Sequence, residues 1–424
     1  MRSLDSPRQR TRVIEAIAPQ RMGRSFRWLM ASSWVSNLGD GLIMSAGPLL
    51  VASQTRDPFL VALAVLLQQL PWLVFGLVAG ALADRLNRRR MVIVVDLVRA
   101  GVLVLLSFSI ATGDVSIAVV LLAMFCLGTA EVFVDTASGT LLPSIVDRDD
   151  LAIGNARLQA GTLTLNHLAG PPIGAALFAA GMAWPFISQA VLITLGALLV
   201  SKVAVSHEPG EPTTRGHVRQ DIAEGFRWVR HHPAVRTLVL TIFIFNITYG
   251  AAISVMVLYA RDQLGLGPLG YGLLITATAF GGLAGTLIYG WITRRVSLGD
   301  IMRAGLIIET LTHLAFVITT VPEVAMGIAF VFGAHAFIWG TTATAVRQRA
   351  VPNELQGRVG SVYGLGLYAG LVVGVAIGGA LAQGWGVTAP FWFAFVGSAL
   401  FVVLIWGQLR HIAHNDSVSD SGAA

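Results

Sequence analysis

Long apolar segments with almost no charge recur along the whole chain. A helix needs about 20 such residues to cross the hydrocarbon core of a bilayer. Runs of this length argue against a transmembrane β-barrel, whose strands are segments of about ten alternating residues. The sequence predicts an all-α membrane protein with twelve transmembrane helices, at residues 28–52, 58–82, 91–111, 116–138, 157–180, 184–203, 234–260, 269–292, 302–320, 322–346, 359–383 and 387–408.

Composition supports the same class of protein. Of 424 residues, 55% are hydrophobic and only 12% are charged, against roughly 25% charged residues in soluble domains. The single lysine, Lys202, follows Ser201, so the chain has no P-loop for ATP. The single cysteine, Cys126, excludes an internal disulfide and a cysteine metal cage. We therefore expect no cofactor and no metal, with a proton gradient as the energy source.

The basic residues follow the positive-inside rule. If the N-terminus is cytoplasmic, only Arg56 and Arg261 of the 29 basic residues fall on the opposite side. The net charge of +6 is then a topology signal, and it does not indicate a nucleic-acid partner. We predict a multi-pass protein of the inner (plasma) membrane with both termini in the cytoplasm. The first span is too long for the apolar region of a signal peptide, so we expect it to be retained.

The longest loop divides the predicted helices six and six. We predict a basic N-terminal tail, a first six-helix bundle, a cytoplasmic linker, a second six-helix bundle and a disordered C-terminal tail, at residues 1–27, 28–203, 204–233, 234–408 and 409–424. The end of the linker reads as an amphipathic helix with Val218, Ile222, Phe226 and Val229 on one face. Such a helix is expected to lie along the cytoplasmic membrane surface.

The two halves repeat each other. Gly170-Pro171-Pro172-Ile173-Gly174-Ala175-Ala176-Leu177 matches Gly374-Val375-Ala376-Ile377-Gly378-Gly379-Ala380-Leu381 at five of eight positions, with an offset of 204. Asn37, Gly41, Ser45 and Leu49 match Asn246, Gly250, Ser254 and Leu258, with an offset of 209. Parallel six-helix repeats are an architecture of secondary transporters, which bind substrate between the repeats near the membrane midplane.

Between the second and third helices stands Gly80-Ala81-Leu82-Ala83-Asp84-Arg85-Leu86-Asn87-Arg88-Arg89-Arg90. This segment resembles the loop signature of the major facilitator superfamily, Gly-x-x-x-Asp-Arg-x-x-Arg-Arg. The resemblance implies two pseudo-symmetric six-helix bundles and a cytoplasmic latch that favours the outward-facing state. It assigns Gly80, Asp84, Arg85 and Arg88 to the latch, with Asp135 as the partner of Arg88. The alternative is a plain cluster of positive-inside charges.

The fifth helix carries Gly170-Pro171-Pro172-Ile173-Gly174-Ala175. Proline removes a backbone hydrogen bond and glycine allows close packing, so we expect a bend and a tight helix contact at Gly170, Pro171 and Gly174. The segment resembles the Gly-Pro-x-x-Gly-Gly signature of drug antiporters in the same superfamily, with Ala175 in place of the last glycine. The alternative is a generic Gly/Pro bend.

Two buried carboxyl groups are candidates for proton coupling. Asp40 lies in the middle of the first span, where a charge costs about 2.5–3.5 kcal/mol on insertion scales. Glu131 lies on the fourth helix, one turn from Asp135, and a carboxyl in low dielectric takes up a proton readily. We favour Asp40 slightly; the alternative is that it braces a neighbouring helix. The substrate cavity is predicted to include Asn37, Asp40, Gln68, Asn246 and Tyr249.

Other polar residues in the spans are expected to be structural. Asp96 and Arg99 read as a local pair near the cytoplasmic start of the third helix. Glu309 and His313 lie one turn apart in the ninth helix. His167 and His335 read as lone packing histidines, because neither has a second metal ligand at i+3 or i+4.

Three further segments resemble the superfamily branch of macrolide-efflux and enterobactin-exporter-like proteins: Val94-Val95-Asp96-Leu97-Val98-Arg99-Ala100, Leu141-Leu142-Pro143 and Val351-Pro352-Asn353-Glu354-Leu355-Gln356-Gly357-Arg358-Val359. The resemblance implies a monomeric, proton-coupled exporter of amphipathic small molecules, with the substrate, protons and lipid as partners. One alternative is an importer or facilitator of a small polar nutrient. A membrane-embedded lipid-modifying enzyme is disfavoured, because the opposite-side loops reach only about eight residues and the acids of the cytoplasmic loops have no metal-binding spacing with a histidine.

Overall fold

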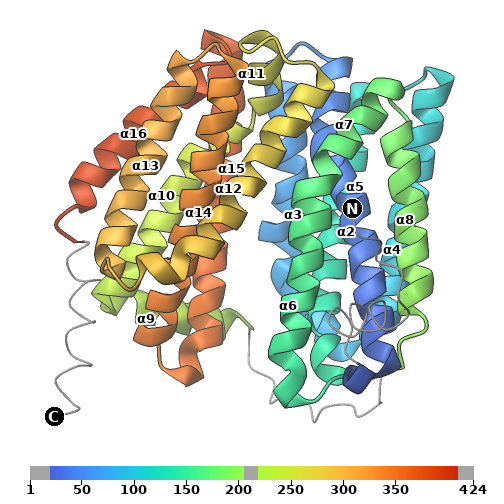
Figure 1. Cartoon of the computed structure of the whole chain (residues 1–424), viewed down its shortest axis with the longest axis horizontal. Coiled ribbons are helices and arrows are strands. Elements are labelled where there is room, and N and C mark those ends of the chain that lie inside the picture. Colours follow the sequence, from blue (N-terminus) through green and yellow to red (C-terminus); the bar gives the residue numbers. More distant parts are fainter. Residues whose placement is uncertain (1–19, 205–217, 409–424) are drawn as a thin grey trace, which may run out of the picture. The chain divides into compact units, whose positions relative to one another are not determined.

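The computed structural model describes residues 20–204 and 218–408, and all regular elements in these ranges are helices (Figure 1). The predicted N-terminal and C-terminal tails and the start of the linker lie largely or wholly outside the described residues. The longer helices are α2 (Gly23–Gln54), α3 (Pro58–Arg85), α4 (Arg88–Thr112), α5 (Ile117–Gly139), α6 (Leu151–Gly161), α7 (Gly170–Ala180), α8 (Trp184–Val200), α9 (Val218–His231), α10 (Pro233–Ile253), α11 (Met256–Asp262), α12 (Pro268–Ile292), α13 (Leu298–Ile318), α14 (Pro322–Ala350), α15 (Gln356–Trp385) and α16 (Ala389–Ile405).

The predicted membrane spans are confirmed within the described residues. Nine helical segments are long and apolar enough to cross a membrane, and α8 and α16 are shorter apolar helices. The remaining predicted span, 157–180, is helical throughout but changes register along its length. The all-α, twelve-helix prediction therefore holds, with ends that differ by a few residues.

Two predicted helices are not regular α-helices. In the fifth span, α6 starts earlier than predicted, at Leu151, and a π-helix (Thr162–Ala169) separates it from α7. Pro171 and Pro172 have no N–H to donate, and the turn before them has changed register: the Gly170 N–H donates five residues back, to the carbonyl of Leu165. The seventh predicted span, 234–260, is broken between α10 and α11.

The chain folds into two compact units. Unit 1 comprises residues 1–46, 74–115 and 126–211, and unit 2 comprises residues 47–73, 116–125 and 212–424. The later part of α2, the first half of α3 and the start of α5 therefore belong to unit 2. Trp72 of α3 stacks on Tyr368 of α15 with ring centroids 5.3 Å apart, which shows how this part of the first half is held in unit 2.

In unit 1, helix α2 crosses α7 at very close range. A Cβ at Gly170 would collide with the backbone of Gly41, and a Cβ at Gly174 would collide with the backbone of Leu42. The Ser45 hydroxyl donates to the carbonyl of Pro171 at 2.7 Å across the same contact. Small residues allow this approach in a membrane helix pair, so the tight contact predicted at Gly170 and Gly174 is present.

Unit 2 contains the same crossing between α10 and α15. A Cβ at Gly374 would collide with the backbone of Ile247, and a Cβ at Gly378 would collide with the backbone of Ala251. Gly378 corresponds to Gly174, and Ala251 corresponds to Leu42, through the two offsets found in the sequence. The internal repeat is thus a repeat of helix packing.

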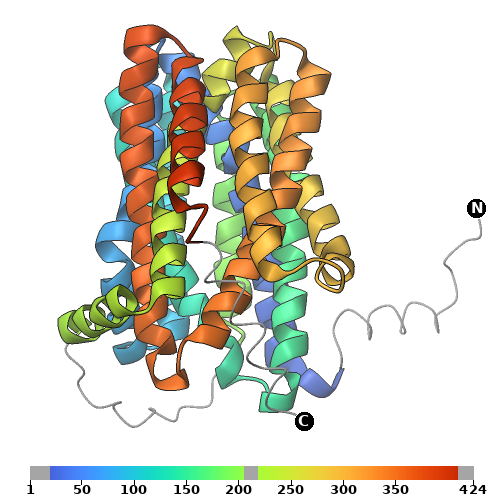
Figure 2. The ribbon, with the colours of Figure 1, turned by 90° about the vertical axis from the view of Figure 1, so that its left-hand side faces the viewer.

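The amphipathic helix α9 runs across the direction of α10 and α15 (Figure 2). Val229 is buried in a cluster with Val235, Val359 and Val362, and Glu224 pairs with Arg358 at 2.7 Å. Phe226 is 62% exposed. The predicted helix exists, and Val229 packs on protein because α15 offers it an apolar surface. Its place along the membrane surface stays a prediction.

Candidate functional site

A salt bridge joins two helices inside unit 1. The Arg99 guanidinium of α4 donates to Asp40 Oδ1 of α2 at 2.6 Å, and its other terminal nitrogen lies 3.6 Å from Asp96 Oδ1. The Arg99 side chain is 4% exposed and the Asp40 side chain 23%. Gln189 of α8 also donates to Asp40 Oδ1, at 3.1 Å. A mid-helix carboxylate is thus held by a charge and by an amide.

Two more carboxyl groups, both on α5, lie within electrostatic range of this pair. Glu131 is partly buried and interacts with Arg99 and Asp40. Asp135, one turn away, is more accessible and interacts with the same two residues. We call this set of residues, Asp40, Asp96, Arg99, Glu131, Asp135 and Gln189, the charged cluster. It brings one guanidinium and four carboxyl groups together in the membrane-spanning region.

The predicted local pair of Asp96 and Arg99 is present, with two differences from the prediction. Arg99 lies in the middle of α4, not near its start, because α4 already begins at Arg88. Its shortest ion pair is with Asp40 on another helix, and Asp96 is the more distant partner. An arginine inside a span is costly and normally requires a counter-ion. That rule marks Arg99 as a residue that needs a counter-ion, but it does not choose between Asp96 and Asp40, and Gln189 carried no such signal.

The predicted latch segment ends α3 and begins α4. Asn87 caps α4 by accepting from the Arg90 N–H at 3.0 Å. Arg88 donates to the carbonyls of Ala83 and Thr140, each at 3.2 Å, and so connects the end of α3 with the end of α5. Cationic side chains at helix C-termini satisfy free carbonyls and oppose the helix dipole. Arg88 therefore bridges two helix ends, and its role in a latch stays a prediction.

Other latch residues are less constrained in this structure. Arg85 is exposed, and the side chain of Asp84 lies outside the described residues. Around Gly80, no other described residue lies within 4 Å of the position where a Cβ would stand. Close helix packing is therefore not the reason for a glycine at position 80 in this conformation, because the neighbouring space is open. The roles of Asp84 and Asp135 in a latch stay a prediction.

The predicted cavity residues fall in both units. In unit 1, Asn37 accepts from Asn166 of the π-helix at 3.4 Å and donates to its own helix. In unit 2, Gln68 is partly buried on α3, and Asn246 donates to the Ile242 carbonyl at 2.7 Å. Tyr249 stacks on Phe332 of α14 with ring centroids 5.5 Å apart. Within the part of the chain that the structure describes, the Gln68 amide and the Tyr249 hydroxyl have no hydrogen-bond partner.

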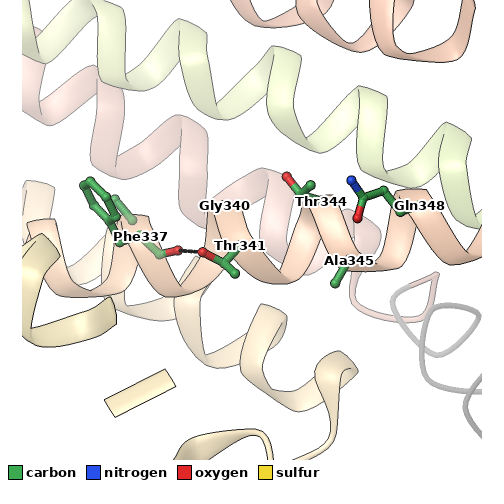
Figure 3. Close-up of a pocket in the computed structure, with 7 residues that line it drawn as sticks. Phe337, Gly340, Thr341, Thr344, Ala345 and Gln348 are labelled. Carbon is green, nitrogen blue, oxygen red and sulfur yellow. Dashed lines mark hydrogen bonds between the residues drawn. The ribbon is translucent and has the colours of Figure 1, made fainter. Parts of the chain in front are cut away.

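One face of α14 forms an open groove of about 600 Å³ in unit 2 (Figure 3). We call it the α14 groove; its lining is Ala336, Phe337, Gly340, Thr341, Thr344, Ala345 and Gln348. Small residues make the hollow, Phe337 supplies an apolar wall, and Thr344 and Gln348 supply hydrogen-bonding groups. This groove was not predicted from the sequence, although the run Gly340-Thr341-Thr342-Ala343-Thr344-Ala345 is unusually small and polar for a membrane helix.

Comparison with known proteins places this fold in a family. The family model described as transmembrane secretion effector matches residues 14–422. The chain is 28% identical over 382 residues to the multidrug efflux pump Tap of Mycolicibacterium fortuitum, covering 86% of this chain and 90% of that protein. It is 25% identical over 417 residues to the enterobactin exporter EntS of Salmonella choleraesuis (strain SC-B67), covering 94% of this chain and 96% of that protein.

Solved structures agree on the fold. A bacterial homologue of the iron transporter ferroportin, in an inward-facing state, matches with a TM-score of 0.73 and 16% identity, covering 91% of this chain and 98% of that one. The nucleoside transporter NupG matches with a TM-score of 0.69 and 11% identity, covering 92% and 99%. The chain belongs to the transmembrane secretion effector family, and it is a transporter of the major facilitator superfamily rather than an enzyme.

Proposed function

We propose that this protein is a proton-coupled exporter of amphipathic small molecules that works by alternating access. It acts as a monomer in the inner (plasma) membrane, with both termini in the cytoplasm. Export is supported by the relatives, which are named as an efflux pump and an exporter. Residues 20–204 and 218–408 offer no group of three or more metal-ligating side chains, and the sequence has no P-loop, so the energy source we propose is the proton gradient.

The charged cluster is the observation that carries this proposal. If all four carboxyl groups were ionised, one guanidinium would leave the cluster with a large net negative charge in a low-dielectric region. Burial of unpaired charge is strongly unfavourable, and carboxyl groups respond by binding protons. A cluster of this kind gains and loses protons when its exposure to water changes, which is what coupling to alternating access requires.

Within the cluster, the two candidate carboxyl groups differ in their partners. Asp40 is held by Arg99 and Gln189, whereas no hydrogen bond or ion pair is recorded for Glu131 within the described residues. An ion-paired carboxylate gives up its charge less readily than an unpaired one. We therefore assign the transported proton to Glu131. When Glu131 loses that proton it competes with Asp40 for Arg99, and this competition links protonation to the packing of α2, α4 and α5.

Substrate chemistry follows from the polar but uncharged surfaces of unit 2. The α14 groove combines the apolar Phe337 with the polar groups of Thr344 and Gln348. Asn246 and Tyr249 on α10 add an amide and a phenol. Such surfaces suit a molecule with a large apolar body and a few hydrogen-bonding groups, and they hold no charge for a small ionic nutrient.

The test is transport by purified protein in liposomes with an imposed proton gradient. We expect a fluorescent amphipathic dye to move against its gradient, and a protonophore to stop it. Glu131→Gln should abolish uphill movement and leave downhill exchange measurable, because glutamine cannot release a proton. Glu354→Gln, an exposed acid in a short loop helix, is the matched control and should transport normally.

Three outcomes would contradict parts of the proposal. Uphill transport that survives the protonophore removes proton coupling. Movement of dye with the proton flow, instead of against it, favours an importer. Uphill transport by Glu131→Gln with the parent pH dependence, together with its loss in Asp40→Asn, returns the proton to Asp40.

A further inference from the structure

A second group of buried ionisable side chains lies in unit 2, on α13 and α14. Glu309 Oε2 lies 3.6 Å from His335 Nε2, and the two side chains are 13% and 4% exposed. This distance is beyond a hydrogen bond, but a shift of less than 1 Å would form one. His335 was expected to be a lone packing residue, but the structure places it beside a carboxyl group.

The surroundings of this pair contain several unsatisfied polar atoms. Within the described residues, no hydrogen-bond partner is found for His313 Nε2, for either ring nitrogen of His335, or for Trp339 Nε1, and all of these atoms are buried. Buried polar groups in folded proteins are nearly always paired, because an unmade hydrogen bond is costly. Their concentration around Glu309 indicates a binding site rather than a hydrophobic core in which every polar group is paired.

An aromatic chain connects the pair to α10. The ring of His335 contacts Phe332 at a centroid distance of 5.6 Å, and Phe332 stacks on Tyr249 at 5.5 Å. On the other side, a Cβ at Gly305 would meet Trp339 at 2.8 Å and His335 Nδ1 at 3.4 Å. The glycine leaves the room in which the two rings lie.

The pair and Tyr249 lie on the helices that correspond to those of the charged cluster in unit 1. Asp40 and Tyr249 are 209 residues apart, Arg99 and Glu309 are 210 apart, and Glu131 and His335 are 204 apart. The first separation equals the offset between the first and seventh spans, and the other two lie within one residue of the offsets of 209 and 204. Three corresponding helices therefore carry ionisable or phenolic side chains in both units.

The titratable groups that interact with this pair come from two helices. His313 lies on α13 and Tyr249 on α10. Tyr271 on α12 interacts with Tyr249 rather than with the pair, and α16, which also packs on α13, carries no titratable residue in 389–405. None of these facing groups is a lysine or an arginine. With one proton the pair is neutral overall; without it, an uncompensated carboxylate stays beside a neutral imidazole. Low dielectric favours the neutral state.

We propose that Glu309 and His335 form a second proton-binding site, in which one proton is shared between carboxyl and imidazole and is linked to the substrate side through Phe332 and Tyr249. Binding of the proton draws the two side chains together and moves the ring of Phe332 with His335. Release leaves the carboxylate without a partner and reverses the movement. This inference rests on the proposed function for its role in transport, but the site itself can be tested without transport.

The site is tested by infrared spectroscopy of the purified protein. His335→Phe keeps an aromatic ring beside Phe332 and removes the imidazole, so Glu309 must hold its proton alone. We expect the carbonyl band of a protonated carboxyl group in His335→Phe and its loss in the double variant His335→Phe/Glu309→Gln. Identical spectra of the two variants across the pH range would show that Glu309 stays charged, and would overturn the proposal.

Its role in transport is tested by the ratio of protons to substrate, measured from the reversal potential in liposomes. Glu309→Gln should lower this ratio by one proton while uphill transport continues. Glu323→Gln, an exposed acid at the start of α14, should leave it unchanged. An unaltered ratio in Glu309→Gln overturns the second site. Absence of any proton coupling in the parent protein defeats the proposed function instead, and the infrared result then still decides whether the pair binds a proton.

Discussion

The salt bridge between Asp40 and Arg99 permits a quantitative prediction. Breaking a buried ion pair by removing one partner costs about 3–5 kcal/mol, because the other charge is left unpaired. The Asp40 side chain is 23% exposed, so water relieves part of this penalty. We expect Arg99→Gln to lower the free energy of unfolding by about 3 kcal/mol, at the lower end of that range.

Asp40→Asn should lower the free energy of unfolding less than Arg99→Gln does. In this variant Arg99 keeps Asp96 as a partner at 3.6 Å, and the new asparagine can still accept a hydrogen bond from Gln189. In the double variant the penalty for an unpaired Asp40 disappears, so the two changes should not add. We expect a coupling energy of about 1–2 kcal/mol from the double-mutant cycle, within the range seen for residues in contact.

The measurement is unfolding in mixed micelles by titration with a denaturing detergent, followed through helix content. The control cycle uses Asp300 and Arg303, which lie one turn apart on α13. A terminal nitrogen of Arg303 is 3.1 Å from Asp300 Oδ1, and the Asp300 side chain is 59% exposed. Exposed pairs of this kind contribute about 0–1 kcal/mol. A coupling energy for Asp40 and Arg99 no larger than that of the control pair would refute the reasoning.

Three further predictions concern packing, the latch and pH. Gly174→Ala and Gly378→Ala should each destabilise the protein by about 1–3 kcal/mol through overpacking, whereas Gly101→Ala, where the Cβ position is open, should be neutral or stabilising. Equal effects of the three substitutions on detergent unfolding would count against the close helix crossings. Asp84→Asn should shift the distribution of spin-label distances across the cytoplasmic face more than it shifts substrate affinity, and an unchanged distribution would remove the latch. Burial lowers the pKa of His232 below its usual 6.5, so the folded state binds fewer protons there and stability is lost as pH falls below about 6.5. His232→Phe should reduce this loss of stability, measured by thermal melts at a series of pH values. Identical dependence of melting temperature on pH in variant and parent would show that the ring does not contribute.

The fold was predictable because its signals are local and strong. Span length, the sidedness of arginine and the repeat of Gly170 in Gly374 each report a physical requirement of the membrane or of helix packing. The breaks in the fifth and seventh spans were not predicted as breaks. Hydropathy is averaged over a whole helix and is not sensitive to a local change in the hydrogen-bond pattern. Pro171 and Pro172 did indicate an irregularity in the fifth span.

The candidate site was predictable only in part, for a physical reason. Asp40 and Glu131 stood out because an acid inside an apolar span is unusual. Their partners did not, because partnership depends on which helices pack together. Arg99 was paired with its neighbour in sequence, Asp96, and that pair is present, but the structure also brings Arg99 to Asp40 on α2, at a shorter distance. The groove on α14 depends on several small side chains lying together on one helix face, and no single residue predicts it.

The two units use one framework for different chemistry. On three corresponding helices, unit 1 has an acid, an arginine and an acid, and unit 2 has a phenol, an acid and an imidazole. An arginine stays charged at any physiological pH, so the first set always contains a cation for which Asp40 and Glu131 can compete. The second set contains no fixed cation, so it is neutral as a whole when Glu309 and His335 share one proton. The first arrangement therefore suits the exchange of a proton against a fixed charge, and the second suits sensing of a proton next to an uncharged, substrate-facing surface. This difference predicts that Glu131→Gln removes the driving force, whereas Glu309→Gln changes the number of protons moved and leaves transport uphill.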